Sequence, residues 1–154
     1  VHHPSIIHYN PDANIHTADD FMTIDRSVEV LIVDTLACNT PSFTKLDLFP
    51  FVHLRQFEVA DCCFVYVKEV RMIELKWLER VVIGEKCFTK EKSRSHLHLK
   101  DCERLRELRI GNHSFENNFS WVIVNLPLLE EIEVGEWRDK KNCGLQTTIM
   151  VKGE

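Results

Sequence analysis

Hydrophobic residues recur along this chain in a pattern that repeats every 24 to 27 residues. Five segments begin at Val28, Leu54, Leu78, Leu105 and Leu129, and in each one the first, fourth and sixth residues are apolar. The fourth and sixth residues are separated by a single residue, so the two apolar side chains point to the same side of an extended chain. This alternation is typical of a strand with one face inward. The pattern therefore predicts five copies of one structural unit.

A second alternating segment precedes each of the last four copies. With the leading residue counted as position 0, positions −8 and −6 of these copies are apolar. Short segments of this kind, rich in Val, Ile and Phe and broken by Gly or Pro, favour strands over helices. One such strand cannot bury its apolar face alone, so each copy needs the next one against it. We expect a mainly β fold, a right-handed solenoid with parallel strands on both sides of each coil.

The two ends of the chain depart from the repeat. In residues 1–27, Thr17 is a suitable cap for a short amphipathic helix over 18–25, and Ile6 and Ile7 are candidates for a further strand. We expect these residues to form an N-terminal cap that covers the open end of the stack.

The repeat array is expected to span residues 28–154. Thr147, Ile149 and Val151 match the second strand of the fifth copy, so a sixth leading residue would fall near or beyond the last residue given. The sequence therefore predicts that the array continues and that this chain is its N-terminal part.

Three of the copies carry a recognisable motif. The string Leu54-x-x-Phe57-x-Val59-x-x-Cys62-x-Phe64 resembles the leucine-rich repeat signature. The segments 83–88 and 110–115, which read Ile-Gly-Glu-Lys-Cys-Phe and Ile-Gly-Asn-His-Ser-Phe, are similar to the core of the BspA-like subclass. The resemblance covers about residues 28–137. It implies a solenoid and a binding role without a catalytic centre, because proteins of that subclass are largely surface, adhesion or interaction proteins.

The chain departs from the leucine-rich repeat pattern at position 8. In the common type this position holds asparagine, whose amides form a ladder that satisfies the backbone of the turns. No asparagine ladder is expected here, because the five copies carry Leu36, Cys62, Lys86, His113 and Trp137.

Composition narrows the classes of partner. The 154 residues have a net charge of −5, and the 19 basic residues are not gathered in a long run, which disfavours nucleic acid and anionic membranes. No stretch reaches the roughly 18 to 20 apolar residues that span a bilayer. We expect a protein or a glycan as partner and no cofactor, while the compartment stays open.

The outward positions of the main strand are the candidate binding surface. Positions 2 and 4 lie on either side of an inward residue and differ from copy to copy, as a recognition surface requires, although a merely solvated face gives the same pattern. The residues that we select for binding are Ile32, Glu58, Arg80, Val82, Glu107, Arg109 and Glu133.

Two further columns have competing interpretations. Position 1 alternates in sign through Glu29, Arg55, Glu79, Arg106 and Glu130, which predicts a ladder of surface ion pairs between neighbouring strands. On the other side of the coil, an apolar stripe of Phe49, Ile73, Lys100 and Val124, with Trp77 nearby, is either a partner surface or buried where this side bends.

Cysteine and histidine raise the question of catalysis. Cys63 and Cys87 share position 9 and are expected to be buried small residues. A metal site from Cys87, His96, His98 and Cys102 is disfavoured, because both histidines point outward on a strand and Cys102 points inward. A nucleophile of Cys62 or Cys63 with His53 has no spacing that supports it.

These patterns favour a non-enzymatic scaffold that presents a repeat surface to a protein or glycan partner. Two alternatives stay open. One is an architectural spacer within a longer repeat protein, and the other is a cysteine-based redox or hydrolytic enzyme.

Overall fold

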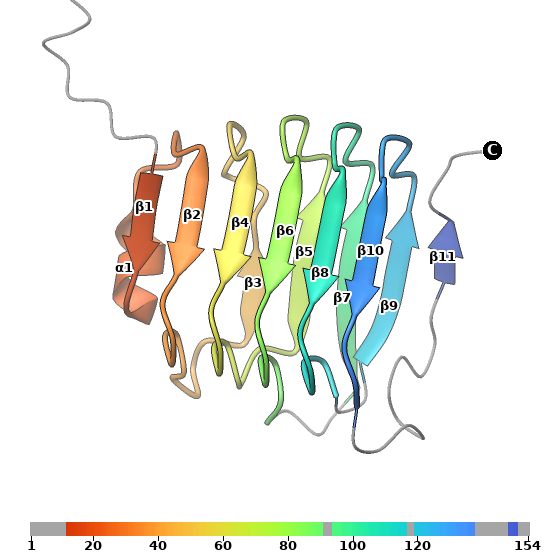
Figure 1. Cartoon of the computed structure of the whole chain (residues 1–154). Helices are drawn as coiled ribbons and strands as arrows, with labels where there is room; N and C mark the ends of the chain where they lie inside the picture. Colours follow the sequence, from red (N-terminus) through yellow and green to blue (C-terminus); the bar gives the residue numbers. More distant parts are fainter. Residues whose placement is uncertain (1–11, 91–93, 117–118, 138–147, 151–154) are drawn as a thin grey trace, which may run out of the picture.

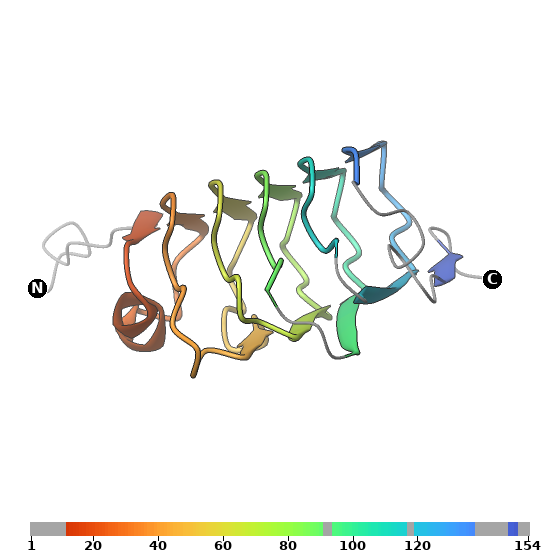
Figure 2. The same cartoon turned by 90° about the horizontal axis from the view of Figure 1, so that it is seen from below.

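The chain winds into a β-solenoid of about four turns. The structure is a computed structural model that describes residues 12–90, 94–116, 119–137 and 148–150. Each complete coil contributes one strand to each of two parallel sheets, which lie on opposite sides of the coil (Figures 1 and 2). The prediction of a mainly β solenoid with parallel strands on both sides is confirmed.

Sheet A contains six strands in the described part of the chain, in the order β1-β2-β4-β6-β8-β10. All neighbouring pairs are parallel. The strands are β1 (Asp12–Ile15), β2 (Val30–Val33), β4 (Gln56–Val59), β6 (Arg80–Ile83), β8 (Glu107–Ile110) and β10 (Glu131–Val134).

Sheet B contains five described strands in the order β11-β9-β7-β5-β3, again parallel. Its strands coincide with the second alternating segment of the repeat. They are β3 (Lys45–Asp47), β5 (Glu69–Ile73), β7 (Ser95–Lys100), β9 (Phe119–Val124) and β11 (Thr148–Met150).

The predicted register of sheet A is confirmed. The position 3 residues Leu31, Phe57, Val81, Leu108 and Ile132 are direct neighbours across the five strands. The first four are at most 1% exposed, whereas Ile132 on the last described strand of the sheet is 45% exposed. The successive coils therefore cover one another's apolar residues.

A row of aromatic rings runs through the core at position 10. The rings of Phe64 and Phe88 stack with centroids 5.5 Å apart, and those of Phe88 and Phe115 stack at 4.3 Å. Trp121 of sheet B meets Phe115 edge to face at 5.8 Å. Because each ring belongs to a different coil, the row joins neighbouring repeats by apolar contact.

A short helix, α1 (Ala18–Thr23), follows β1 at the N-terminal end of the stack (Figure 2). Thr17 caps it, since its hydroxyl accepts from the Asp20 N–H while the Asp20 carboxylate accepts from the Thr17 N–H. Phe21 packs against the rings of Phe43, Phe51 and Phe64. The helix ends at Thr23, two residues before the expected end at residue 25. The strand expected at residues 6 and 7 lies outside the described residues.

The strand β1 adds a sixth member to sheet A ahead of Val28, within the residues expected to form the cap. It pairs with β2 through Ala13 and Ile15, which are buried beside Leu31 and Val33. In the described part of the chain no helix is long and apolar enough to cross a membrane.

The backbone itself forms the ladder in the turns that asparagine would otherwise supply. At position 8 the residues of the first four copies have left-handed backbone with φ between 57° and 65°, and each N–H donates to the position 7 carbonyl of the next repeat. Left-handed backbone costs a non-glycine residue about 1 to 2 kcal/mol, which these bonds help to offset. The four bonds run from Leu36 to Asp61 (3.0 Å), Cys62 to Glu85 (2.9 Å), Lys86 to Asn112 (2.9 Å) and His113 to Glu136 (2.7 Å).

Candidate functional site

The residues selected for binding lie together on the outer face of sheet A. Alternation along each strand turns positions 2 and 4 away from the core, so all of them are half-buried or exposed. At position 4 the register brings them side by side in the order Ile32, Glu58, Val82, Arg109 and Glu133, while Arg80 and Glu107 are neighbours at position 2. We call this surface the sheet A face.

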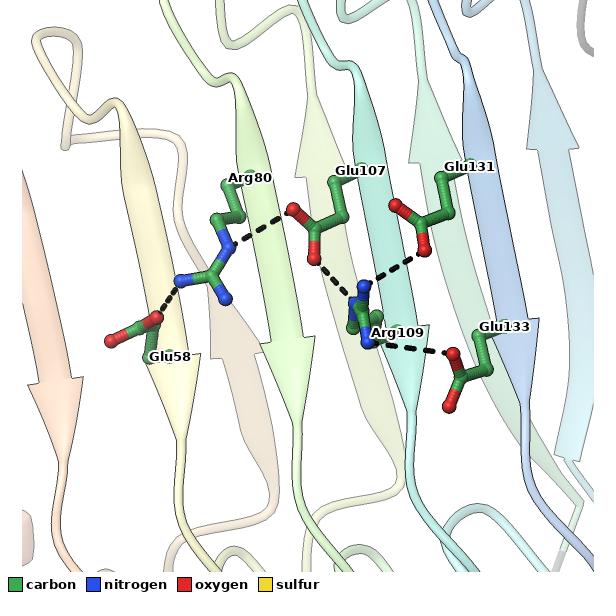
Figure 3. Close-up of polar contacts among 6 residues, drawn as sticks. All are labelled: Glu58, Arg80, Glu107, Arg109, Glu131 and Glu133. Atoms are coloured by element: carbon green, nitrogen blue, oxygen red, sulfur yellow. Dashed lines mark hydrogen bonds and ion pairs between the residues drawn. The ribbon is translucent and has the colours of Figure 1, made fainter.

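Five of these residues belong to one network of ion pairs (Figure 3). Arg80 lies between Glu58 of the preceding strand and Glu107 of the following strand, with 3.1 Å between its Nε and the Glu107 carboxylate. Arg109 contacts Glu107 on its own strand and Glu133 on the next strand, the latter at 3.4 Å. The network therefore crosses four strands and holds both guanidinium groups against the sheet.

Glu131 completes the network, although it was not among the residues selected from the sequence. Its carboxylate accepts from Arg109 Nη2 at 2.8 Å. The signal that could have found it is diagonal, because Arg109 at position 4 pairs with Glu131 at position 2 of the next copy. Comparing charges only within one column misses such a pair.

The network shifts the ionisation of its central carboxylate. Partial loss of solvent raises the pKa of Glu107, but hydrogen bonds from Arg109 and Arg80 outweigh this effect and hold the pKa below its ordinary value. The same bond with Glu107, together with the charge of Glu131, raises the pKa of Arg109. Both groups are therefore charged at neutral pH.

The sheet A face has an apolar part and an acidic part. Val30 and Ile32 on β2 and Val82 on β6 are half-buried apolar side chains of this face. The network runs from β4 to β10 and contains four glutamates and two arginines, so it carries two uncompensated negative charges. A basic group beside an apolar side chain is complementary to this combination.

The charge ladder predicted at position 1 is present for most of the column. Arg55 lies between Glu29 at 3.6 Å and Glu79 at 3.4 Å, and Arg106 pairs with Glu130 at 2.8 Å. These side chains are well exposed, so each pair contributes at most about 1 kcal/mol. The column therefore contributes only modestly to the stability of the stack.

The alternative that the apolar stripe is buried is wrong for its two aromatic residues. Phe49 is 70% exposed and Trp77 is 39% exposed. Ile73, Lys100 and Val124 are half-buried on the outer face of sheet B, where Lys100 lies in register between the other two. These positions are therefore in contact with solvent, but Lys100 interrupts the stripe.

The position 9 cysteines are buried, as predicted, and they also donate hydrogen bonds. The Sγ atoms of Cys63 and Cys87 donate to carbonyl oxygens of the preceding repeat, those of Asp34 at 2.9 Å and Ala60 at 3.1 Å. The hydrogen bond with Cys63, together with burial, raises the pKa of Cys87. The Cys87 thiol is therefore a poor nucleophile at neutral pH, whereas the same bond lowers the pKa of Cys63.

The remaining candidates for chemistry do not converge. His96 is exposed and His98 half-exposed, while Cys102 is fully buried and burial raises its pKa to about 11. Cys62 and His53 line two different surface hollows. Among the described residues no group of three His, Cys, Asp or Glu side chains is placed to hold a metal ion.

Comparison with known proteins gives no match, whether with family models, with curated proteins or with solved structures.

Proposed function

We propose that this chain is a non-enzymatic interaction module that binds a partner protein through the sheet A face. The observation that carries the proposal is the fixed network of Arg80 and Arg109 with their four glutamates beside the apolar residues Ile32 and Val82. Side chains that are already held in place lose little conformational freedom when a partner binds. The excess of carboxylates favours a segment of the partner that carries basic and apolar residues.

The resemblance to leucine-rich repeats of the BspA-like subclass supports the same role. The position 6 glycines, the position 9 small residues and the position 10 phenylalanines of the described coils fit the core motif of that subclass. We infer that the coil is right-handed, as parallel crossovers are, and that α1 closes the N-terminal end of the stack. Packing of Phe21 against Phe43, Phe51 and Phe64 supports the capping role.

The experiment measures binding of the full chain to three immobilised peptides of equal length, one rich in Lys and Leu, one in Gln and Leu, and one in Glu and Leu. The basic peptide is expected to bind most tightly to the sheet A face, with an affinity that falls as salt rises. The double variant Glu131→Lys/Glu133→Lys should weaken this binding about tenfold, because it reverses the charge of the acidic part.

The matched control is Asp47→Lys/Glu69→Lys, which makes the same change in net charge on sheet B. Equal weakening by both double variants would show attraction by net charge alone and would contradict the proposal. A set of neutral oligosaccharides is tested in parallel. Binding of one of them that depends on the sheet A face, without peptide binding, would make the partner a glycan and overturn the proposal of a protein partner.

A further inference from the structure

A second surface lies at the corner where each coil returns from sheet B to sheet A. A groove of about 650 Å³ follows this corner across several repeats. One wall consists of the position −1 residues of four successive copies, and the other of the first three residues of the charge ladder at position 1. The lining residues are Ser27, His53, Trp77 and Arg104 on the first wall and Glu29, Arg55 and Glu79 on the second.

The exposed aromatic residue in this groove is Trp77. Its neighbours hold it in place, since the Arg104 guanidinium lies over the indole ring at 4.3 Å and the Lys76 amine at 5.8 Å. Such contacts are worth about 0.5 to 1 kcal/mol at an exposed site. Trp121, by contrast, is 3% exposed in the core. An indole that stays open to solvent and is held by two cations is a preformed contact point for a partner.

The charges of the groove are unevenly matched. Arg55 is satisfied by Glu29 and Glu79, which flank it in the charge ladder. Arg104 has no carboxylate within ion-pair distance among the described residues, and its guanidinium lies over the ring of Trp77. Five of the other described arginines pair with a carboxylate, while Arg26 donates to backbone carbonyls; the five are Arg55, Arg71, Arg80, Arg106 and Arg109. The N–H groups of the Arg104 guanidinium are therefore available to a carboxylate from another molecule.

The corner also offers apolar contact beyond Trp77. Val52 is 55% exposed and Leu128 is 43% exposed. Val52 is the residue before His53, and Leu128 has the same repeat position as Trp77 and Arg104. An apolar side chain of a partner can thus contact the groove or its ends while a neighbouring carboxylate reaches Arg104.

We propose that this corner groove binds a peptide segment of a partner protein that carries a carboxylate next to an apolar side chain. The carboxylate pairs with Arg104, and the apolar side chain packs on the exposed part of Trp77. This preference is opposite in charge to that of the sheet A face, so the two surfaces bind different segments. An acidic sugar fits less well, because it would stack on the face of Trp77 that Arg104 covers.

The test uses the full chain and follows tryptophan fluorescence during titration with the Glu/Leu peptide, with its Gln/Leu analogue as the uncharged probe. We expect the acidic peptide to change the emission of Trp77 and to bind at least about tenfold more tightly than the analogue. The variant Trp77→Phe should lose the emission change, which assigns the signal to this residue rather than to Trp121 or Trp137. Binding of the acidic peptide should fall about tenfold in Arg104→Glu.

The matched control is Arg106→Glu, two residues further along the chain, where the arginine pairs with Glu130 outside the groove. It makes the same change in charge, so equal weakening by both variants would overturn the proposal. Equal affinity for the acidic peptide and its Gln analogue would also overturn it. So would an acidic oligosaccharide that binds through Arg104 when the peptide does not. Circular dichroism of both variants confirms that each is folded before binding is compared.

The two proposals fail separately. The sheet A double variant changes two residues of β10 and is tested with the basic peptide, whereas Arg104→Glu changes the corner groove and is tested with the acidic peptide. Either surface can prove inactive without changing the result for the other.

Discussion

Glycine at position 6 is required by the close approach of neighbouring coils. A Cβ atom at Gly111 would lie 2.6 Å from the carbonyl carbon and oxygen of Gly84 in the preceding coil. Those atoms directly follow β6, and the Gly84 carbonyl accepts a hydrogen bond from the Ser114 hydroxyl, so they cannot shift without disturbing that bond. Position 6 is Asp34 and Ala60 in the first two copies, so the restriction applies to the last three copies, which carry Gly84, Gly111 and Gly135.

Replacing Gly111 with alanine is therefore expected to destabilise the chain by about 1 to 3 kcal/mol, through overpacking against Gly84. Urea denaturation followed by circular dichroism measures the loss. Lys68→Ala, at an exposed side chain, is the control and should change stability by less than about 0.5 kcal/mol. A Gly111→Ala variant as stable as the control would show that the coils can separate at this point.

The position 9 side chains hydrogen bond across the coils. Ser114 does so twice, since its hydroxyl donates to the Gly84 carbonyl at 2.6 Å and accepts from the Cys87 N–H at 3.0 Å. Removing this buried hydroxyl leaves both partners without a bond.

We therefore expect Ser114→Ala to cost about 1 to 3 kcal/mol in unfolding free energy. Cys87→Ser should cost much less, because a serine hydroxyl can donate to the same Ala60 carbonyl. The same urea series measures both variants. If the two were equally destabilising, volume rather than hydrogen bonding would decide what position 9 tolerates.

Among the elements, the strands of sheet A differ in how well they are covered. Leu108 on β8 and Ile132 on β10 occupy the same position in neighbouring strands, but Leu108 is 1% exposed and Ile132 is 45% exposed. Val134 on β10 is also 39% exposed. In the described part of the chain, β10 is the outermost strand on this side of sheet A.

Truncation at these two matched positions should have different effects. Leu108→Ala is expected to cost about 2 to 5 kcal/mol, as for a buried leucine, whereas Ile132→Ala should cost less than about 1 kcal/mol. Amide hydrogen exchange should likewise be faster in β10 than in β8. Equal losses would mean that Ile132 is covered in solution.

The ion pairs between β6, β8 and β10 make the pKa of the Glu107 carboxyl on β8 depend on side chains of neighbouring residues. Hydrogen bonds from Arg109 and Arg80 outweigh the effect of desolvation and lower the pKa of Glu107. Because the folded pKa lies below the unfolded value of about 4.3, the stabilisation is present above that pH and is lost as the pH falls through the folded pKa.

Arg109→Gln is expected to raise the pKa of Glu107 toward its ordinary value, because the bond that lowers it most is removed. An NMR titration of the Glu107 carboxyl carbon measures this shift. Arg106→Gln serves as control, since Arg106 pairs with Glu130 instead. A Glu107 pKa that moved equally in both variants would indicate a general field rather than the network in Figure 3.

The strands of the repeat were predictable because the spacing of apolar residues fixes both their faces and their neighbours. β1 was not predicted, since Ala13 and Ile15 are its only buried residues and the leading apolar residue of the repeat motif is absent ahead of them. The backbone ladder at position 8 could not be inferred, because residues such as Leu36 and Lys86 rarely adopt left-handed backbone. Contacts such as Arg104 on Trp77 join side chains of different coils and depend on rotamers that a sequence pattern does not specify.

At the scale of the whole molecule, each coil meets its neighbours through the same set of contacts. Sheet A, sheet B, the turn ladder and the phenylalanine row all continue from one repeat to the next. In such an array, stability is approximately a sum of the units and their interfaces.

Deleting the whole repeat 78–104, so that Trp77 precedes Leu105, should therefore leave a folded chain with a lower unfolding midpoint. Val70 would then neighbour Trp121, and Phe57 would neighbour Leu108, which keeps apolar residues together. Deleting only residues 78–90 removes β6 but keeps β7, so sheet A and sheet B no longer match and the chain should fail to fold. Circular dichroism with thermal unfolding distinguishes the two, and a whole-repeat deletion that also fails would contradict interchangeable coils.

The turn ladder has a consequence for how such a protein can vary. Since the bonds of this ladder join main-chain groups, the side chain at position 8 can change without loss of those bonds. The outside of the molecule can then diversify from coil to coil, and whole units can be gained or lost in frame, while the cross-section is preserved. The length of the array and the chemistry of its outer surface can thus change independently in one scaffold.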